Sequence, residues 1–288
     1  MRTLVVNSGE IAHMSHGDSS KPLIGEEMGD RDLNIYSEGL GILVEDGIIL
    51  SIRDSEELIS EYAPSWDRNS EKIGDMNIID AKGGAIVPGF VDSHTHLIWG
   101  GDRSNEMALR QRGLSYSDIS KLGGGISKTV EATRRLSILE LVDIGVQRAS
   151  NALRMGTTTM EAKSGYGLST ESELKLLEAT ERVNRISVCD IQATWLGAHD
   201  VPKQNNKEEY IEELISKQLP MVVEQGIAVW ADVFCEPGWF TVDDTIEIIT
   251  ASKNVGLGSR IHADEFLDSG GLGIAAELGS ISADHVAK

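Results

Sequence analysis

The sequence predicts an α/β protein made of a TIM-like (β/α)8 barrel, with about six of its eight units present, and a small N-terminal β domain. The barrel is predicted by strand-like and helix-like segments that alternate after Gly89, as in a parallel sheet with crossover helices. It is also predicted by histidines and carboxylates where these strands end, because barrel enzymes carry their chemistry there. We therefore assign residues 1–84 to a sandwich-like β domain and residues 85–288 to the barrel.

The composition is that of a soluble globular protein. The 288 residues are 40% apolar and 25% charged, and no window approaches the ~18 uninterrupted apolar residues of a membrane span. The N-terminus lacks the apolar core of a signal peptide, and two cysteines give no disulfide framework, so we expect a cytoplasmic protein. A formal net charge of −20 argues against nucleic acid or an anionic membrane as a partner. We interpret the acidity as a solvated surface, with a saline habitat as the alternative.

The N-terminal segment contains short strands and turns. Asp46-Gly47 is a hairpin signal between two apolar runs, and the stretch rich in Gly, Ser and Asp before it predicts a loop. In chain order we expect a strand, a loop, a hairpin, a helix and a strand at residues 3–6, 8–32, 41–52, 54–62 and 77–80.

The segment after Gly89 predicts six strands and five helices. The helix at 138–155 has apolar residues three to four apart, as one buried helix face requires. The strands are expected at 90–97, 157–163, 190–198, 230–235, 258–263 and 280–285, and the helices at 138–155, 170–184, 207–225, 241–253 and 271–278. Since a closed barrel needs eight such units, we expect a chain that is truncated at its C-terminus.

The first of these strands ends in a His-x-His pair. Side chains two apart in a strand point to the same face, so His94 and His96 are spaced to hold one metal ion. Five of the seven histidines fall at strand ends, while His13 and His16 lie in the polar loop near the N-terminus. Any one of the five could be a structural residue, but together they predict a metal site.

Neutral imidazoles suit zinc, iron and similar divalent ions, and a catalytic site combines about three protein ligands with an open position. His94, His96 and His262 would supply the imidazoles, and a carboxylate would complete the set. Such an ion lowers the pKa of a bound water to about 7. Glu265, three residues after His262, is placed to move the proton; the alternative is an ordinary loop carboxylate.

Residues 88–96, Pro-Gly-Phe-Val-Asp-Ser-His-Thr-His, resemble the first barrel strand of the amidohydrolase superfamily of metal-dependent hydrolases. More narrowly, the chain resembles the imidazolonepropionases. The resemblance covers nearly all of the chain from Val87 onward. The blocks that narrow it are Lys-Ser-Gly-Tyr-Gly at 163–167 and His-Ala-Asp-Glu at 262–265.

The resemblance implies roles for individual residues. It makes His94, His96 and His262 ligands of one zinc or iron ion per subunit. Arg103, Tyr166 and His199 would bind the substrate, with Tyr116 a further candidate near the same pocket. Glu265 would contact the substrate ring or handle the proton, and His285 would lie beside the water on the metal. A homodimer is also suggested by the resemblance alone.

The chemistry implied is the opening of the cyclic amide of 4-imidazolone-5-propanoate, in histidine degradation, to give N-formimidoyl-L-glutamate. Arg103 would pair with the propionate carboxylate. Two alternatives remain open: another cyclic amidase or ring deaminase of the superfamily, and a non-catalytic metal-binding fragment. The resemblance also implies a further aspartate ligand at the end of an eighth strand, which we expect beyond Lys288. We expect Asp264 and Asp284 to orient neighbouring histidines instead.

Overall fold

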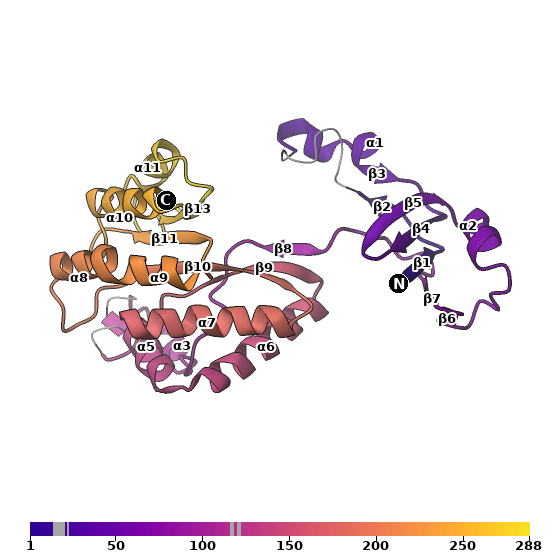
Figure 1. Ribbon diagram of the computed structural model, residues 1–288. Coiled ribbons are helices and arrows are strands. Elements are labelled where there is room, and N and C mark those ends of the chain that lie inside the picture. Colours follow the sequence, from indigo (N-terminus) through magenta and orange to yellow (C-terminus); the bar gives the residue numbers. More distant parts are fainter. Residues whose placement is uncertain (14–20, 22, 116–117, 120–121) are drawn as a thin grey trace. The chain divides into compact units, whose positions relative to one another are not determined.

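A computed structural model describes residues 1–13, 21, 23–115, 118–119 and 122–288 (Figure 1). The chain divides into two compact units, Met1–Gly89 and Phe90–Lys288. Within the described residues, no helix combines the length and the apolar character needed to cross a membrane.

The N-terminal unit is built on a five-stranded sheet in which β1 is central, paired antiparallel to β4 and parallel to β7. The strand order is β5-β4-β1-β7-β6, with bounds Ile48–Asp54, Leu40–Glu45, Arg2–Val6, Met76–Asp80 and Lys72–Ile73. Helix α2 (Ser55–Tyr62) packs Leu58 against Leu4 and Leu43 of this sheet. The Asp54 carboxylate caps the helix by accepting from two of its first N–H groups.

Most expectations for this unit are confirmed. The strands at 3–6 and 77–80 and the helix at 54–62 are present, and the hairpin turns at Asp46 and Gly47 with φ of 49° and 84°. The expected loop at 8–32 is wrong in part. It contains strand β2 (Ile11–Ala12), which pairs with β3 (Ile35–Tyr36), and helices η1 (Gly25–Gly29) and α1 (Arg31–Asn34). The Asp30 carboxylate caps α1 by accepting from the N–H groups of residues 32 and 33. A polar residue that suggested a loop therefore starts a short helix.

The second unit contains one sheet of six strands, all parallel, in the order β13-β12-β11-β10-β9-β8. From β8 to β13 the strands span Phe90–Asp92, Thr157–Lys163, Asp190–Ala198, Trp230–Cys235, Gly258–Ala263 and Ser282–His285. The helices are α3 (Glu106–Gln111), α5 (Ile126–Arg135), α6 (Ile138–Arg154), α7 (Thr170–Ile186), α8 (Lys207–Glu213), α9 (Leu219–Gln225), α10 (Val242–Asn254) and α11 (Gly271–Glu277). The α/β character with a parallel sheet is therefore confirmed.

The four interior strands match the prediction residue for residue, whereas the outer two are shorter. Strand β8 ends at Asp92, so His94 and His96 lie beyond its last paired residue. The chain still stays beside β9, because Lys163 N donates to Thr95 O at 2.9 Å. The expected helix at 207–225 is divided by one π turn, η2 (Leu214–Gln218). Helix α3 was not expected from the sequence.

The helices cover the sheet through tightly packed apolar contacts. Helices α6 and α7 approach closely at Gly145, where an added Cβ would lie 2.6 Å from a Val183 methyl group. The Ser137 side chain and Glu140 form a capping box that starts α6. The Tyr210 hydroxyl donates to Gly197 O at 2.8 Å and ties α8 to β10. This packing fixes the strand ends at which the polar side chains gather.

Candidate metal centre

Three histidines meet at the carboxyl edge of the parallel sheet. His94 and His96 follow β8, and His262 lies in β12. The ring centroids of His94 and His262 are 4.6 Å apart, and that of His96 lies 5.7 Å from each. One ring nitrogen from each residue lies within 4.8 Å of the others, a spacing that one metal ion can bridge.

The Nδ1 atom of each of these rings faces an oxygen of the protein. His94 Nδ1 lies 2.9 Å from Asp284 Oδ2, and His96 Nδ1 lies 3.2 Å from Ser164 O. His262 Nδ1 lies 2.9 Å from Asp232 Oδ2, at the distance of an ion pair rather than in the alignment of a hydrogen bond. Carboxylate and carbonyl oxygens can accept a hydrogen but not donate one, so these positions favour the tautomer that carries the hydrogen on Nδ1 and leaves the Nε2 lone pair for a metal.

The electrostatics of the centre suit a divalent cation. Burial lowers the pKa of His96 and His262, so both imidazoles are neutral near pH 7. Burial would raise the pKa of Asp232, but His262 and Lys163 hold it well below its usual range. In the same way, the hydrogen bond from His94 and the charge of Lys163 lower the pKa of Asp284 to about 2. Neutral nitrogen donors backed by ionised carboxylates fit a zinc-like or iron-like ion.

His199 and Tyr166 lie on one side of this centre. The His199 ring stacks on His96 at 4.7 Å between centroids, and the Tyr166 ring lies 5.1 Å from His96 and 5.2 Å from His199. His199 Nδ1 faces Gly165 O at 2.9 Å. Tyr166 and His199, two of the predicted substrate residues, thus lie beside His96, a predicted metal ligand.

Arg103 and Glu265 line a cavity of about 490 Å³ together with Arg110, Leu114 and Phe266. The Arg103 guanidinium also pairs with the buried Glu106 carboxylate, through Nε at 3.0 Å and Nη2 at 2.9 Å. Arg110 could not be selected from the sequence, since it belongs to no motif and lies on the unexpected helix α3. Among the described residues, its guanidinium has no hydrogen bond or ion pair.

His285 and Glu265 face each other, with His285 Nε2 3.5 Å from Glu265 Oε2. The His285 ring lies 4.9 Å from His94 and 5.1 Å from His262. The loop that carries Glu265 is held by Glu236, a buried residue whose carboxylate accepts from the N–H groups of residues 265, 266 and 267. Tyr116, the remaining predicted substrate residue, lies outside the described residues.

The two predicted orienting aspartates differ. Asp284 faces His94, as expected. Within the part of the chain that the structure describes, Asp264 makes no hydrogen bond to a histidine ring; its carboxylate accepts instead from the N–H groups of Ser269, Gly271 and Leu272. It therefore shapes the start of α11, because free N–H groups at a helix start need acceptors.

The sequence and the fold are similar to those of known proteins. A model of the amidohydrolase family matches residues 77–140. The imidazolonepropionase of Symbiobacterium thermophilum is 42% identical over 286 residues, which make up 98% of this chain and 64% of that protein. The imidazolonepropionase of Geobacillus thermodenitrificans is 40% identical over 288 residues, 99% of this chain and 66% of that protein. The chain belongs to the amidohydrolase family and is related to the imidazolonepropionases.

A solved structure also resembles this amidohydrolase. It is the 5-methylcytosine deaminase of Klebsiella pneumoniae liganded with phosphonocytosine, with a TM-score of 0.61, 16% identity, and coverage of 96% of this chain and 55% of that one. At this identity the likeness shows the fold alone. The amidohydrolase chain spans 64% and 66% of the length of the two curated relatives above.

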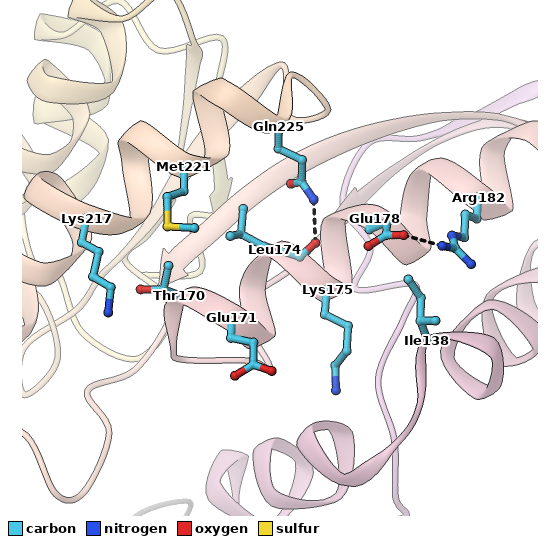
Figure 2. A pocket seen from close by; sticks show the side chains of 10 residues that line it. All are labelled: Ile138, Thr170, Glu171, Leu174, Lys175, Glu178, Arg182, Lys217, Met221 and Gln225. Carbon is cyan, nitrogen blue, oxygen red and sulfur yellow. Dashed lines mark hydrogen bonds and ion pairs between the residues drawn. The ribbon is translucent and has the colours of Figure 1, made fainter.

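A second, larger hollow of the amidohydrolase lies on the helical layer (Figure 2). It is a groove of about 730 Å³ between α7 and the η2–α9 segment, with Leu174, Lys175 and Met221 among its lining residues. Gln225 Nε2 donates to Leu174 O at 2.9 Å across it. None of the predicted site residues that the structure describes lines this groove, so the histidine centre remains the candidate site.

Lowering the pH from 7 to 5 is expected to destabilise the metal-free amidohydrolase. Burial lowers the pKa of His96, of His262 and of His199, the last to about 3, whereas an unfolded histidine titrates near 6.5. The unfolded state therefore binds protons that the folded state does not, at about 1.4 kcal/mol per pH unit for each histidine. Asp200 opposes this, because burial raises its pKa to about 6 and it gains a proton in the folded state. Urea unfolding at pH 7, 6 and 5 measures the balance; greater stability at pH 5 would contradict it.

Proposed function

We propose that the protein is an imidazolonepropionase-type hydrolase, which opens the cyclic amide of 4-imidazolone-5-propanoate to give N-formimidoyl-L-glutamate in histidine degradation. The observation that carries the proposal is the meeting of His94, His96 and His262 at one sheet edge. Identity of about 40% to imidazolonepropionases over nearly the whole chain supports the choice of substrate. We further propose that the six parallel strands belong to a (β/α)8 barrel and that residues 1–84 form a β domain that precedes it in the sequence.

His94, His96 and His262 would hold one zinc or iron ion through Nε2, each ring being oriented through its Nδ1. When bound, such an ion supplies Lewis-acid activation of water and of a carbonyl group. Imidazole ligands suit both zinc and iron, so this ligand set accepts either ion.

The side chains around the ion carry the rest of the reaction. Arg103 and Arg110 bind the propionate carboxylate in the cavity that they share with Glu265. Tyr166 and His199 hold the ring against the His96 side of the centre. Glu265 takes the proton of the attacking water and returns it to the ring nitrogen as the C–N bond of the cyclic amide breaks, with His285 at its side.

The test is turnover of 4-imidazolone-5-propanoate by the full-length gene product, followed by mass spectrometry of the product. We expect N-formimidoyl-L-glutamate and a loss of turnover after chelation. Release of ammonia from a ring amino group, with the ring left closed, would point to a deaminase instead. A protein that binds metal but turns over neither class of substrate would support the non-catalytic alternative.

Replacing Arg110 by glutamine is expected to raise KM for the imidazolone about 10- to 100-fold, with a small effect on kcat. The reason is the loss of one charge-assisted contact, worth about 1.5–3 kcal/mol. Arg112→Gln is the matched control, because Arg112 is exposed at the end of the same helix and does not line the cavity. Steady-state kinetics decide between the two; equal KM values for both variants would remove Arg110 from the substrate site.

We also propose a cytoplasmic location and a homodimer. Cys189 and Cys235 are both buried and free, which suits a reducing compartment. The dimer rests on the resemblance to the family, and light scattering of the purified gene product tests it.

A further inference from the structure

Lys163, at the end of β9, is a charged side chain inside the protein. Its side chain is fully buried, and Nζ lies 2.9 Å from Glu161 Oε2, 2.6 Å from Asp232 Oδ2 and 3.1 Å from Asp284 Oδ2. Burial alone would neutralise an ammonium group, but these three carboxylates raise the pKa of Lys163 and keep it charged.

Two of these oxygens are the atoms that face the histidine rings. Asp232 Oδ2 lies 2.9 Å from His262 Nδ1, and Asp284 Oδ2 lies 2.9 Å from His94 Nδ1. Each oxygen is thus held between the Lys163 ammonium on one side and an imidazole on the other. One cation therefore fixes the partners of two rings from distant parts of the sheet. His94 follows the edge strand β8, and His262 lies in β12, which is next to the other edge strand, β13.

The third carboxylate that contacts Lys163 Nζ is that of Glu161. Glu161 is buried and also contacts the Arg260 guanidinium at 3.0 Å and the Thr194 hydroxyl at 2.5 Å. These contacts with Arg260 of β12 and Thr194 of β10 restrain Glu161, and Glu161 in turn helps to hold Nζ.

We propose that Lys163 is a positioning residue, which holds Asp232 and Asp284 so that His262 and His94 keep Nδ1–H toward the carboxylates and Nε2 toward the metal. The inference rests on the proposed function only in treating these histidines as metal ligands. Carboxylates behind metal-binding histidines fix the tautomer and the ring orientation, and losing such a partner costs about 10- to 100-fold in metal affinity. Lys163 acts through the two aspartates and would therefore affect two ligands, His262 and His94, at once.

The sign of the effect separates positioning from simple repulsion. A fixed positive charge near a metal site disfavours a divalent cation. If Lys163 acted only through its charge, removing it would tighten metal binding. Positioning predicts the opposite, weaker binding, because both rings lose their fixed orientation.

The experiment is Lys163→Met in the full-length gene product, with Zn²⁺ and Co²⁺ affinities measured by competition with a chelator. We expect a 10- to 100-fold weaker affinity and an altered Co²⁺ absorption spectrum, with circular dichroism near that of the unchanged protein. The matched control is Lys175→Met, which removes an ammonium that donates to Arg134 O and Leu136 O away from the centre. Unchanged or tighter binding in folded Lys163→Met would overturn the proposal.

A second measurement covers a variant that fails to fold and separates this inference from the function. In the metal-free, unchanged protein, ¹H–¹⁵N spectra of the imidazoles should show Nδ1–H tautomers for His94 and His262. Asp284→Asn should disturb His94 and leave His199, whose Nδ1 faces Gly165 O, unaffected. These tautomers in a protein that binds no metal would sink the proposed function and keep the positioning role. Freely exchanging tautomers of His94 and His262 in the unchanged protein would overturn the positioning role.

Discussion

Replacing His262 by alanine is expected to abolish metal binding and to lower turnover at least ~10³-fold, because the ion lowers the pKa of water by several units. His262 is almost fully buried and lies within bridging distance of both His94 and His96. The two imidazoles that remain, those of His94 and His96, form an incomplete ligand set for a catalytic metal site. Metal content by elemental analysis should fall from about one ion per chain to nearly none.

The control for this variant is His13→Ala. His13 belongs to the N-terminal unit, where its ring stacks on Tyr36 at 4.3 Å, and it is no part of the histidine centre. It should retain metal and turnover. Because His262→Ala also leaves Asp232 without its ring partner, unfolding of both variants must be compared in the metal-free state. Full metal content in a folded His262→Ala variant would contradict the assigned ligand set.

Replacing Glu173 by alanine is expected to lower the free energy of unfolding by about 3 kcal/mol or more. The Glu173 carboxylate is fully buried and accepts from the N–H groups of Gly165, Gly167 and Leu168 at 2.7–2.9 Å. Each buried N–H left without an acceptor costs about 1–3 kcal/mol. Urea unfolding measures the loss, and KM should rise too, since these groups carry the loop of Tyr166.

Two variants make this prediction specific. Glu173→Gln keeps one acceptor oxygen and should lose less stability than Glu173→Ala. Glu171→Ala, on the exposed side of the same helix, should stay within about 0.5 kcal/mol of the unchanged protein. Equal losses for Glu173→Ala and Glu171→Ala would show that the loop does not depend on the buried carboxylate.

The interior of the sheet could be predicted from the sequence because each strand is a short apolar run between turns. Strands β9 to β12 follow that pattern, and so does the amphipathic helix α6. The edges could not be predicted as well. The sequence predicts a strand that continues to Leu97, but the pairing of this strand with β9 stops at Asp92.

The meeting of His94, His96 and His262 could be predicted because their positions at strand ends are visible along the chain. Their partners could not. Asp232 and Lys163 are 69 residues apart and look like ordinary charged residues until the fold brings them together. Arg110 gave no signal for the same reason. Asp264, two residues after His262, is expected from the sequence to orient a ring, but its carboxylate accepts from N–H groups at the start of α11, so closeness in sequence misled here.

Glu236 has a consequence for how such a protein can change during evolution. Its carboxylate holds the loop at residues 265–267 through main-chain N–H groups, and these are present whatever side chains the loop carries. Side chains at Glu265 and Phe266, which line the cavity, can therefore be exchanged while the loop keeps its path. The shape of this loop is therefore insensitive to the side chains at these two positions, provided that the acid at position 236 persists.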